Sequence, residues 1–244
     1  MRRLLAGDRA SMDGRGQANW PEDAGAGGRL DVRGGNPLRL LPKPIHDGFL
    51  AITEPFVDGL IRAGVGPNLI TTVGTLVVVV SGVAYGLGAI RWGGALLLAS
   101  GIVDTLDGAV ARKTGKATRF GAFYDSTLDR VGDGATFMGI GVWLMVTPAE
   151  VAWRPWAVAM CMVAIIASLL VSYARARAEG LGLDCKVGIA QRAERIVGLG
   201  LLSVFVGAGP QALVLEAAVL VLTLASLITV VQRVVFVYQV TEGR

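Results

Sequence analysis

The sequence has little of several residue types on which soluble proteins commonly depend. Only 17% of its 244 residues are charged, whereas soluble domains carry roughly a quarter. Two cysteines, Cys161 and Cys185, are too few for a disulfide scaffold, and no paired cysteine and histidine spacing indicates zinc. The single histidine, His46, lies outside the apolar part and leaves no room there for a Ser-His-Asp triad. These scarcities argue against a free-standing soluble domain.

Apolar residues are abundant instead, at 53% of the chain. A membrane-spanning helix needs about twenty consecutive, largely apolar residues, and six segments of that kind follow one another. We therefore predict an all-α integral membrane protein whose six transmembrane helices form one domain over residues 64–240. The predicted spans are residues 67–87, 92–112, 120–146, 151–174, 188–208 and 211–237.

The amino-terminal quarter differs from the rest. Residues 1–42 are rich in Gly, Arg, Asp and Pro and show no apolar period, which predicts a disordered cytoplasmic arm. Residues 43–63 carry apolar side chains at helical spacing with acids between them, which indicates an amphipathic juxtamembrane helix in the membrane interface. A helix packed on another part of the protein is the alternative. The apolar positions are Ile45, Phe49, Ile52, Phe56 and Leu60.

Lysine and arginine predict the orientation, because loops rich in these residues stay in the cytoplasm. The segments around residues 112–119 and 175–195 are basic, whereas the other turns hold only Arg91 and Arg154. We therefore expect a multi-pass protein of the cell (plasma) membrane with both termini in the cytoplasm. The net charge of +4 favours an anionic partner, and the hydropathy makes membrane lipid or phosphate the expected partner rather than nucleic acid.

Four carboxylates interrupt the second and third predicted spans. Asp104 and Asp107 share one helix face, and Asp125 and Asp129 share another. A lone carboxylate at the centre of a membrane costs about 2.5–3.5 kcal/mol, so acids on neighbouring antiparallel helices need compensation. Hard oxygen ligands of this kind suit Mg²⁺ or Mn²⁺ together with a substrate phosphate. A proton or cation pathway through a transporter remains the alternative.

The same residues resemble a known signature. Asp104-x-x-Asp107-Gly108-x-x-Ala111-Arg112, then eight residues, then Gly121-x-x-x-Asp125-x-x-x-Asp129 is similar to the motif of the CDP-alcohol phosphotransferases. The resemblance implies a homodimer of six-helix subunits with a two-metal site that opens to the cytoplasm. It also implies transfer of a substituted phosphate from a CDP-linked donor, here CDP-diacylglycerol, to an alcohol.

The resemblance implies a role for each matching residue. Asp104, Asp107, Asp125 and Asp129 would bind two Mg²⁺ or Mn²⁺ ions per active site, and Asp129 would also deprotonate the acceptor hydroxyl. A second group of residues would hold the cytidine diphosphate part of the donor. These residues are Asn68, Leu69, Ile70, Thr71, Gly108, Ala111, Arg112, Thr118 and Gly121.

The acceptor is predicted from the basic ends of the later spans. Arg175, Arg195 and Arg233 lie at the inner ends of different helices and together could bind a dianionic phosphate. The segments around them resemble the phosphatidylinositol phosphate synthase branch, which implies inositol 1-phosphate as acceptor. We interpret Arg177, Lys186 and Arg192 as positive-inside anchors.

Three alternatives stay open. Phosphatidylglycerol phosphate synthase, or another enzyme of the class, would use a different alcohol. A cation-coupled transporter would also place acids inside spans, although the sequence shows no inverted repeat of the kind that many transporters have. A noncatalytic lipid-binding protein would have no use for a base such as Asp129.

Overall fold

A computed structural model describes residues 11–12, 18–19, 43–147 and 152–243 of the chain. The chain divides into two units, Met1–Arg33 and Gly34–Arg244. In the first, strand β1 (Ser11–Met12) pairs antiparallel with β2 (Ala18–Asn19). The rest of the predicted arm over residues 1–42 lies outside the described residues, so its predicted disorder stays a prediction.

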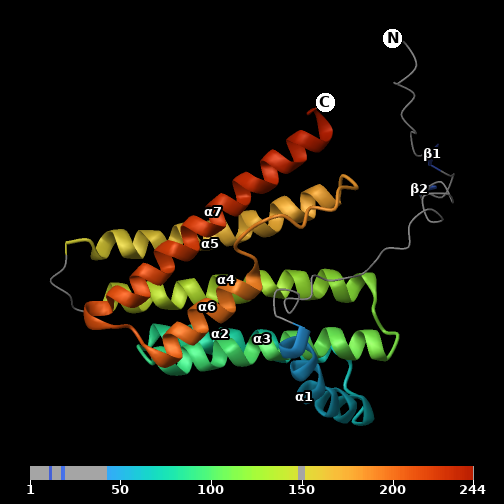
Figure 1. Cartoon of the computed structure of the whole chain (residues 1–244), viewed down its shortest axis with the longest axis horizontal. Coiled ribbons are helices and arrows are strands. Elements are labelled where there is room, and N and C mark those ends of the chain that lie inside the picture. Colours follow the sequence, from blue (N-terminus) through green and yellow to red (C-terminus); the bar gives the residue numbers. More distant parts are fainter. Residues whose placement is uncertain (1–10, 13–17, 20–42, 148–151, 244) are drawn as a thin grey trace. The chain divides into compact units, whose positions relative to one another are not determined.

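The described part of the second unit is built from helices (Figure 1). Each of the six predicted spans corresponds to one helix, from α2 to α7, and α1 corresponds to the predicted amphipathic segment. A 3-10 turn, η3 (Pro210–Ala212), precedes α7. The helices are α1 (Lys43–Arg62), α2 (Pro67–Gly86), α3 (Ile90–Lys113), α4 (Arg119–Val146), α5 (Arg154–Glu179), α6 (Arg192–Phe205) and α7 (Leu213–Thr241).

Four stretches of the described chain are long and apolar enough to cross a membrane: α2, α3, α5 and η3 with α7. The protein is therefore a multi-pass membrane protein. The other two predicted spans are less apolar or shorter. Helix α4 is long but contains Asp125, Asp129, Arg130 and Asp133, and α6 has 14 residues, a length of about 21 Å. The sequence pattern predicted α6 over 21 residues, but residues 188–191 precede the helix in an irregular linker.

A short turn places the acidic faces of α3 and α4 next to each other. Gly115, with φ of +67°, provides the left-handed conformation that turns the chain after α3. Thr118 then caps α4, because its hydroxyl accepts a hydrogen bond from the Gly121 amide at 2.9 Å. The turn makes α3 and α4 antiparallel, as the sequence predicted, but the two helices pack mainly against α2 and make few direct contacts with each other.

Helix α2 packs against both α3 and α4, and its contact with α4 is a contact between backbones. A Cβ atom on Gly139 would lie 2.0 Å from the Gly82 carbonyl oxygen, and one on Gly82 would lie 2.4 Å from that of Ala135. Only glycine fits at both positions. Helix α5 packs against α4 and α7, and α6 packs against α3. Tyr85 of α2 is fully buried and donates a hydrogen bond to Ser203 of α6 at 2.8 Å.

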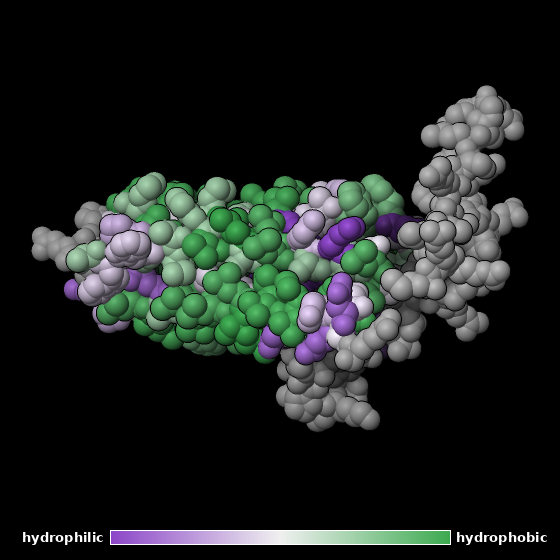
Figure 2. Space-filling model, turned by 90° about the horizontal axis from the view of Figure 1, so that it is seen from above, coloured by the Kyte–Doolittle hydropathy of each residue, from purple (hydrophilic) through white to green (hydrophobic). Residues whose placement is uncertain are grey.

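Large apolar side chains cover the outside of the helices. Figure 2 shows them as a broad green region, with hydrophilic residues gathered toward the ends of the helical part. Examples are Val80 on α2, Met138 on α4, Ile166 on α5 and Val221 on α7, each between 53% and 62% exposed. An apolar surface of this extent is typical of a protein embedded in lipid.

Helix α1 runs continuously through Pro55, although proline inside a helix removes a backbone donor. Val57 is buried against Ile70 and Val110. Lys113, at the end of α3, contacts Asp58 at 2.7 Å and Glu54 at 3.2 Å. The described half of α1 is thus fastened to α3 by both apolar and ionic contacts. Its predicted place in the membrane interface stays a prediction.

A buried ion pair joins the amino-terminal ends of α5 and α7. Arg154 Nε lies 3.2 Å from Glu216 Oε1, and both side chains are at most 10% exposed. Trp153 donates its indole N–H to Glu216 Oε2 at 3.0 Å, and Arg154 also donates to the Gln211 carbonyl at 2.9 Å. We call Arg154 and Glu216 the α5–α7 pair.

Candidate active site

The four aspartates predicted from the signature gather between α3 and α4; we call them the acidic cluster. Asp107 is buried, and its Oδ2 accepts a hydrogen bond from Thr71 of α2 at 2.7 Å. Asp104 and Asp129 lie close enough to Asp107 to act on it electrostatically, and Asp104 and Asp107 act in the same way on Asp125. The two helix faces therefore converge as predicted.

An arginine from a third helix enters the acidic cluster. Arg192, the first residue of α6, places Nη1 against Asp104 Oδ2 and 2.9 Å from Asp129 Oδ1. A fifth carboxylate, Asp133, lies one turn beyond Asp129 on α4, 3.9 Å from Arg192 Nε. Asp133 also binds Arg195, whose Nη2 is 2.5 Å from Asp133 Oδ2. Arg192 and Asp133 thus link the acidic cluster to α6.

The acidic cluster provides donors that suit a divalent cation. Carboxylate oxygens from α3 and α4 already meet on a single positive atom, Arg192 Nη1, and hard oxygen donors are those that Mg²⁺ and Mn²⁺ prefer. Among the described residues, no three acidic, histidine or cysteine side chains are spaced as they would be around an ion. The residue types suit a divalent cation, but their present spacing does not surround one, because Arg192 lies between Asp104 and Asp129.

Residues predicted to hold the nucleotide flank the acidic cluster at the start of α2 and at the α3–α4 turn. A Cβ atom on Gly121 would lie 3.1 Å from Thr118 Oγ1 and 3.4 Å from Asn68 Oδ1, so these three residues adjoin. On α3, a Cβ atom on Gly108 would lie 3.0 Å from Arg112 Nη1, so the arginine side chain folds over this glycine. Ala111 is half-buried on the same face. These small residues leave room beside polar groups.

Two of the predicted nucleotide residues contribute no polar side chain there. Ile70 is 5% exposed and packs in the apolar cluster with Val57 and Val110. Leu69 is exposed. Asn68 is also exposed, whereas Thr71 is buried and occupied by its hydrogen bond to Asp107. At the start of α2, the accessible polar group is therefore that of Asn68.

The three arginines predicted to bind an acceptor phosphate lie close enough to act on one another electrostatically; we call them the basic cluster. Arg175 and Arg195 are charged neighbours of Arg233. Arg175 pairs with Glu179 on its own helix at 2.8 Å. Arg233 is buried and donates to two backbone carbonyls, those of Val187 at 3.0 Å and of Val171. Its guanidinium therefore fastens the linker before α6 to α5 and α7.

Arg195 has donors to spare within the basic cluster. It is 4% exposed, and one of its nitrogens binds Asp133. Its Nε and Nη1 atoms are buried and have no hydrogen-bond partner among the described residues. Because buried donors without partners are costly, these two atoms are suited to an anion.

Sequence reasoning missed three residues of this region. The position of Arg192 in a basic loop favours a membrane anchor, but the structure shows its guanidinium in contact with Asp104 and Asp129 of the acidic cluster. Asp133 continues the four-residue spacing from Asp125 and Asp129, which was the available signal. Tyr124 shares a hydrogen bond with Thr72 at 3.0 Å and so joins α4 to α2 beside Asp125; no sequence pattern indicated it.

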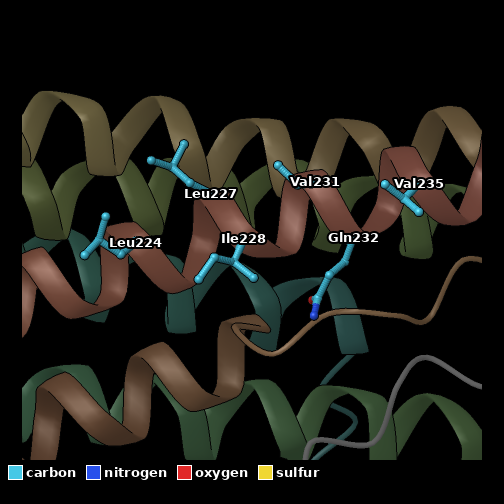
Figure 3. Close-up of a pocket in the computed structure, with 6 residues that line it drawn as sticks. All are labelled: Leu224, Leu227, Ile228, Val231, Gln232 and Val235. Atoms are coloured by element: carbon cyan, nitrogen blue, oxygen red, sulfur yellow. The ribbon is translucent and has the colours of Figure 1, made fainter.

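A shallow groove on the outer face of α7 has a different character. Figure 3 shows that five apolar side chains and Gln232 line it, and none of these residues is titratable. The groove therefore offers apolar surface and no group for acid–base or metal chemistry. Its lining residues are Leu224, Leu227, Ile228, Val231, Gln232 and Val235.

Comparison with known proteins gives the family. The family model described as CDP-alcohol phosphatidyltransferase matches residues 65–239, which include α2 to α6 and most of α7. The chain belongs to this family. It is therefore an enzyme of the CDP-alcohol phosphatidyltransferase class, and the acidic cluster carries the signature by which this membership was predicted.

Two named relatives indicate which synthases within the family the chain resembles. A phosphatidylinositol phosphate synthase of Cutibacterium acnes is 39% identical over 204 residues, which cover 80% of this chain and 97% of that protein. An archaetidylinositol phosphate synthase of Methanothermobacter thermautotrophicus is 38% identical over 195 residues, which cover 78% and 93%. The enzyme thus resembles synthases of inositol-containing phospholipids.

Solved structures of one such synthase share the fold. The phosphatidylinositol phosphate synthase of Mycobacterium tuberculosis with CDP-DAG bound matches with a TM-score of 0.68 and 34% identity, covering 77% of this chain and 94% of that one. The same protein in complex with manganese and citrate matches with a TM-score of 0.67 and 35% identity, covering 76% and 88%. Divalent metal use by this family is consistent with the donors of the acidic cluster.

Proposed function

We propose that this enzyme transfers the phosphatidyl group of CDP-diacylglycerol to inositol 1-phosphate, giving phosphatidylinositol phosphate and CMP. The observation that carries this proposal is the junction of two oppositely charged clusters. The acidic cluster contacts α6 through Arg192, and Asp133 connects that contact to the buried, partly unpartnered Arg195. A nucleotide-linked donor and a phosphorylated acceptor need such neighbouring sites.

Asp104, Asp107, Asp125 and Asp129 would hold two divalent cations, Mg²⁺ or Mn²⁺. When bound, such ions neutralise the charge of the donor pyrophosphate and of the oxygens between which the phosphoryl group moves. Thr71 supports this arrangement, because its hydrogen bond to Asp107 Oδ2 fixes that carboxylate from the neighbouring helix.

The donor would lie with its cytidine diphosphate beside the α3–α4 turn. Arg112 offers a positive charge beside Gly108, and the small side chains at Gly108, Ala111 and Gly121 leave space for the pyrophosphate and nucleoside. Thr118 and Asn68 adjoin Gly121 and offer hydrogen-bonding groups. The segment 68–71 would thus contact the nucleotide through Asn68, while Leu69, Ile70 and Thr71 would support it.

Bond making and breaking occur at the phosphorus atom that carries diacylglycerol. An acceptor hydroxyl attacks this phosphorus, and the bond to the oxygen that bridges toward cytidine breaks, so that CMP leaves with that oxygen. Asp129 receives the hydroxyl proton. Asp129 supports this role because it is the member of the acidic cluster nearest in sequence to Asp133, and its Oδ1 lies 2.9 Å from Arg192 Nη1.

The acceptor assignment depends on the basic cluster. The free Nε and Nη1 donors of Arg195 would bind the acceptor phosphate, with charge contributed by Arg175 and Arg233. The named relatives support an inositol phosphate acceptor. One is named for an archaetidyl lipid and the other for a phosphatidyl lipid, but both names contain inositol phosphate. An unphosphorylated alcohol would leave the buried donors of Arg195 unpaired.

The enzyme would work from the cytoplasmic side of the plasma membrane. We propose that all six helices from α2 to α7 cross the bilayer, with α1 in the interface and both termini in the cytoplasm. Helices α4 and α6 pack against α2, α5 and α3, so they would be sheltered partly by protein. The family resemblance further supports a homodimer.

The test is CMP release by the purified full chain in detergent with CDP-diacylglycerol and one acceptor at a time. Inositol 1-phosphate, glycerol 3-phosphate, inositol and serine are compared with Mg²⁺, with Mn²⁺ and with excess EDTA. We expect turnover with inositol 1-phosphate and either ion, and none with EDTA. Preference for glycerol 3-phosphate would identify a phosphatidylglycerol phosphate synthase instead, and full activity in EDTA would contradict the metal site.

A further inference from the structure

Arg192 binds the oxygens that a divalent cation would use. Its Nη1 atom contacts Asp104 Oδ2 on α3 and Asp129 Oδ1 on α4, and the side chain is 22% exposed. A guanidinium nitrogen and a metal ion cannot both lie between these two carboxylates. The contact is therefore more than an anchor at a helix end, because it takes ligands from the proposed metal site.

We propose that Arg192 is an internal competitor of the divalent cation: it neutralises Asp104 and Asp129 until a cation displaces it. This inference rests on the proposed metal site and adds a role for a residue outside the family signature. Displacement leaves the guanidinium with a partner, because Asp133 Oδ1 lies 3.9 Å from Arg192 Nε. Arg192 can thus leave the acidic cluster without losing every counter-charge.

The neighbouring arginines do not bridge carboxylates of α3 and α4 as Arg192 does. Arg130 also lies near Asp129, but at 3.9 Å, and its Nη1 donates to the Ser126 carbonyl of its own helix. Arg175 pairs with Glu179 on its own helix. Arg192 instead reaches from α6 to carboxylates on two other helices. Arg130 therefore serves as a matched control, with the same charge near the same carboxylate and no direct place in the cluster.

The two possible roles of Arg192, competitor or support of the metal site, predict opposite changes in metal affinity when the side chain is removed. If Arg192 oriented Asp104 and Asp129 for the metal, its removal would weaken metal binding. If it competes, its removal strengthens binding, because every molecule then offers free carboxylates. The sign of the change in Mn²⁺ affinity therefore distinguishes the two roles without any measurement of activity.

The experiment is a Mn²⁺ titration of the full chain in detergent, with free Mn²⁺ followed by electron paramagnetic resonance. We expect Arg192→Gln to lower the Mn²⁺ Kd about tenfold and Arg130→Gln to lower it no more than about twofold, because that charge acts at longer range. Thermal unfolding gives a second readout. Without metal, Arg192→Gln should melt below the wild type, and Mn²⁺ should raise its Tm by more.

Unchanged or weaker Mn²⁺ binding by Arg192→Gln, relative to Arg130→Gln, would overturn the inference. If Arg192→Gln does not fold, Arg192→Lys decides, because lysine keeps the charge but lacks the planar fork of the guanidinium; Mn²⁺ binding equal to the wild type would then count against competition. Failure of the wild type to bind Mn²⁺ would remove the proposed metal site as well. Normal Mn²⁺ binding and CMP release, with no effect of either Arg192 variant, would remove the competition alone.

Discussion

Arginine–carboxylate contacts occur near both ends of α7, and their charges are balanced differently. Near its start, the α5–α7 pair matches one guanidinium with one carboxylate. Trp153 donates a hydrogen bond to the carboxylate, and the Gln211 carbonyl accepts one from the guanidinium, whose Nε and Nη1 have no hydrogen-bond partner among the described residues. Toward its other end, about 25 Å along the helix from Glu216 to Arg233, the acidic cluster and Asp133 present five carboxylates. These meet the guanidinium groups of Arg130, Arg192 and Arg195.

The difference in balance separates a structural contact from a chemical one. A buried pair of equal and opposite charges needs no further ion, and its loss destabilises the fold. Carboxylates in excess repel one another unless protons or cations lie between them. The unbalanced end is therefore the one at which we propose that metal and substrate bind. Substitutions at the two ends test this comparison, and an exposed ion pair elsewhere gives a reference for a small effect.

Asp129→Asn should stop the reaction and leave the fold intact. The amide cannot accept the hydroxyl proton, and general base catalysis contributes about a hundredfold to ten-thousandfold in rate, so CMP release should fall by that factor. CMP release is measured together with the Tm. Asp184→Asn is the control, because Asp184 is exposed and, within the described part of the chain, pairs with Lys186 alone. Turnover of Asp129→Asn close to that of Asp184→Asn would exclude Asp129 as the base.

Glu216→Gln, in the α5–α7 pair, should destabilise the fold and leave the reaction of the folded protein nearly unchanged. It leaves Arg154 buried without its counter-charge, which costs about 3–5 kcal/mol of stability. We expect a clearly lower Tm in detergent, with KM values near those of the wild type for the protein that remains folded. A Tm unchanged by Glu216→Gln, or a selective loss of acceptor affinity, would break the distinction between the two ends.

Arg195→Gln should weaken the acceptor more than the donor. Removing the buried guanidinium removes charge-assisted hydrogen bonds worth about 1.5–3 kcal/mol, so the KM for inositol 1-phosphate should rise about tenfold or more. The KM for CDP-diacylglycerol should change little. Steady-state kinetics with each substrate varied in turn provides the measurement. An equal rise in both KM values would place the acceptor phosphate elsewhere.

Lys113→Ala should have the smallest effect. Lys113 contacts Glu54 and Asp58 across exposed surface, and exposed ion pairs contribute little to stability. The apolar contact of Val57 with Val110 holds α1 on α3 in the variant. Thermal unfolding should therefore be nearly unchanged. A large drop in Tm would show that the ionic contact, rather than the apolar one, secures α1.

The sequence predicted those features that depend on spacing along a single helix. Four-residue spacing placed Asp125 and Asp129 on one face, and a short turn required α3 and α4 to be antiparallel, although both pack mainly against α2. The apolar segments predicted where each helix lies to within a few residues in most cases. Convergence of the acidic cluster follows from these two local properties.

Contacts made by long side chains through an irregular linker could not be predicted in this way. Arg192 follows residues 180–191, which have no repeating pattern from which a direction could be inferred. A basic residue there has many possible partners, so membrane anchoring was the simpler interpretation. Arg233 shows the same limit, because its bonds to the Val171 and Val187 carbonyls depend on how that linker folds back.

The meeting of Gly82 and Gly139 has a consequence for the geometry of the reaction. These residues let main-chain atoms of α2 and α4 touch four residues before the end of α2 and seven before the end of α4, while Asn68 and Asp125 lie toward the opposite ends, where we propose that the substrates bind. No flexible side chain serves as a spacer at that crossing. The distance between the proposed nucleotide contact at Asn68 and the carboxylate of Asp125 would therefore depend on rigid peptide groups. Exchange of the surrounding lipids would leave that distance unchanged.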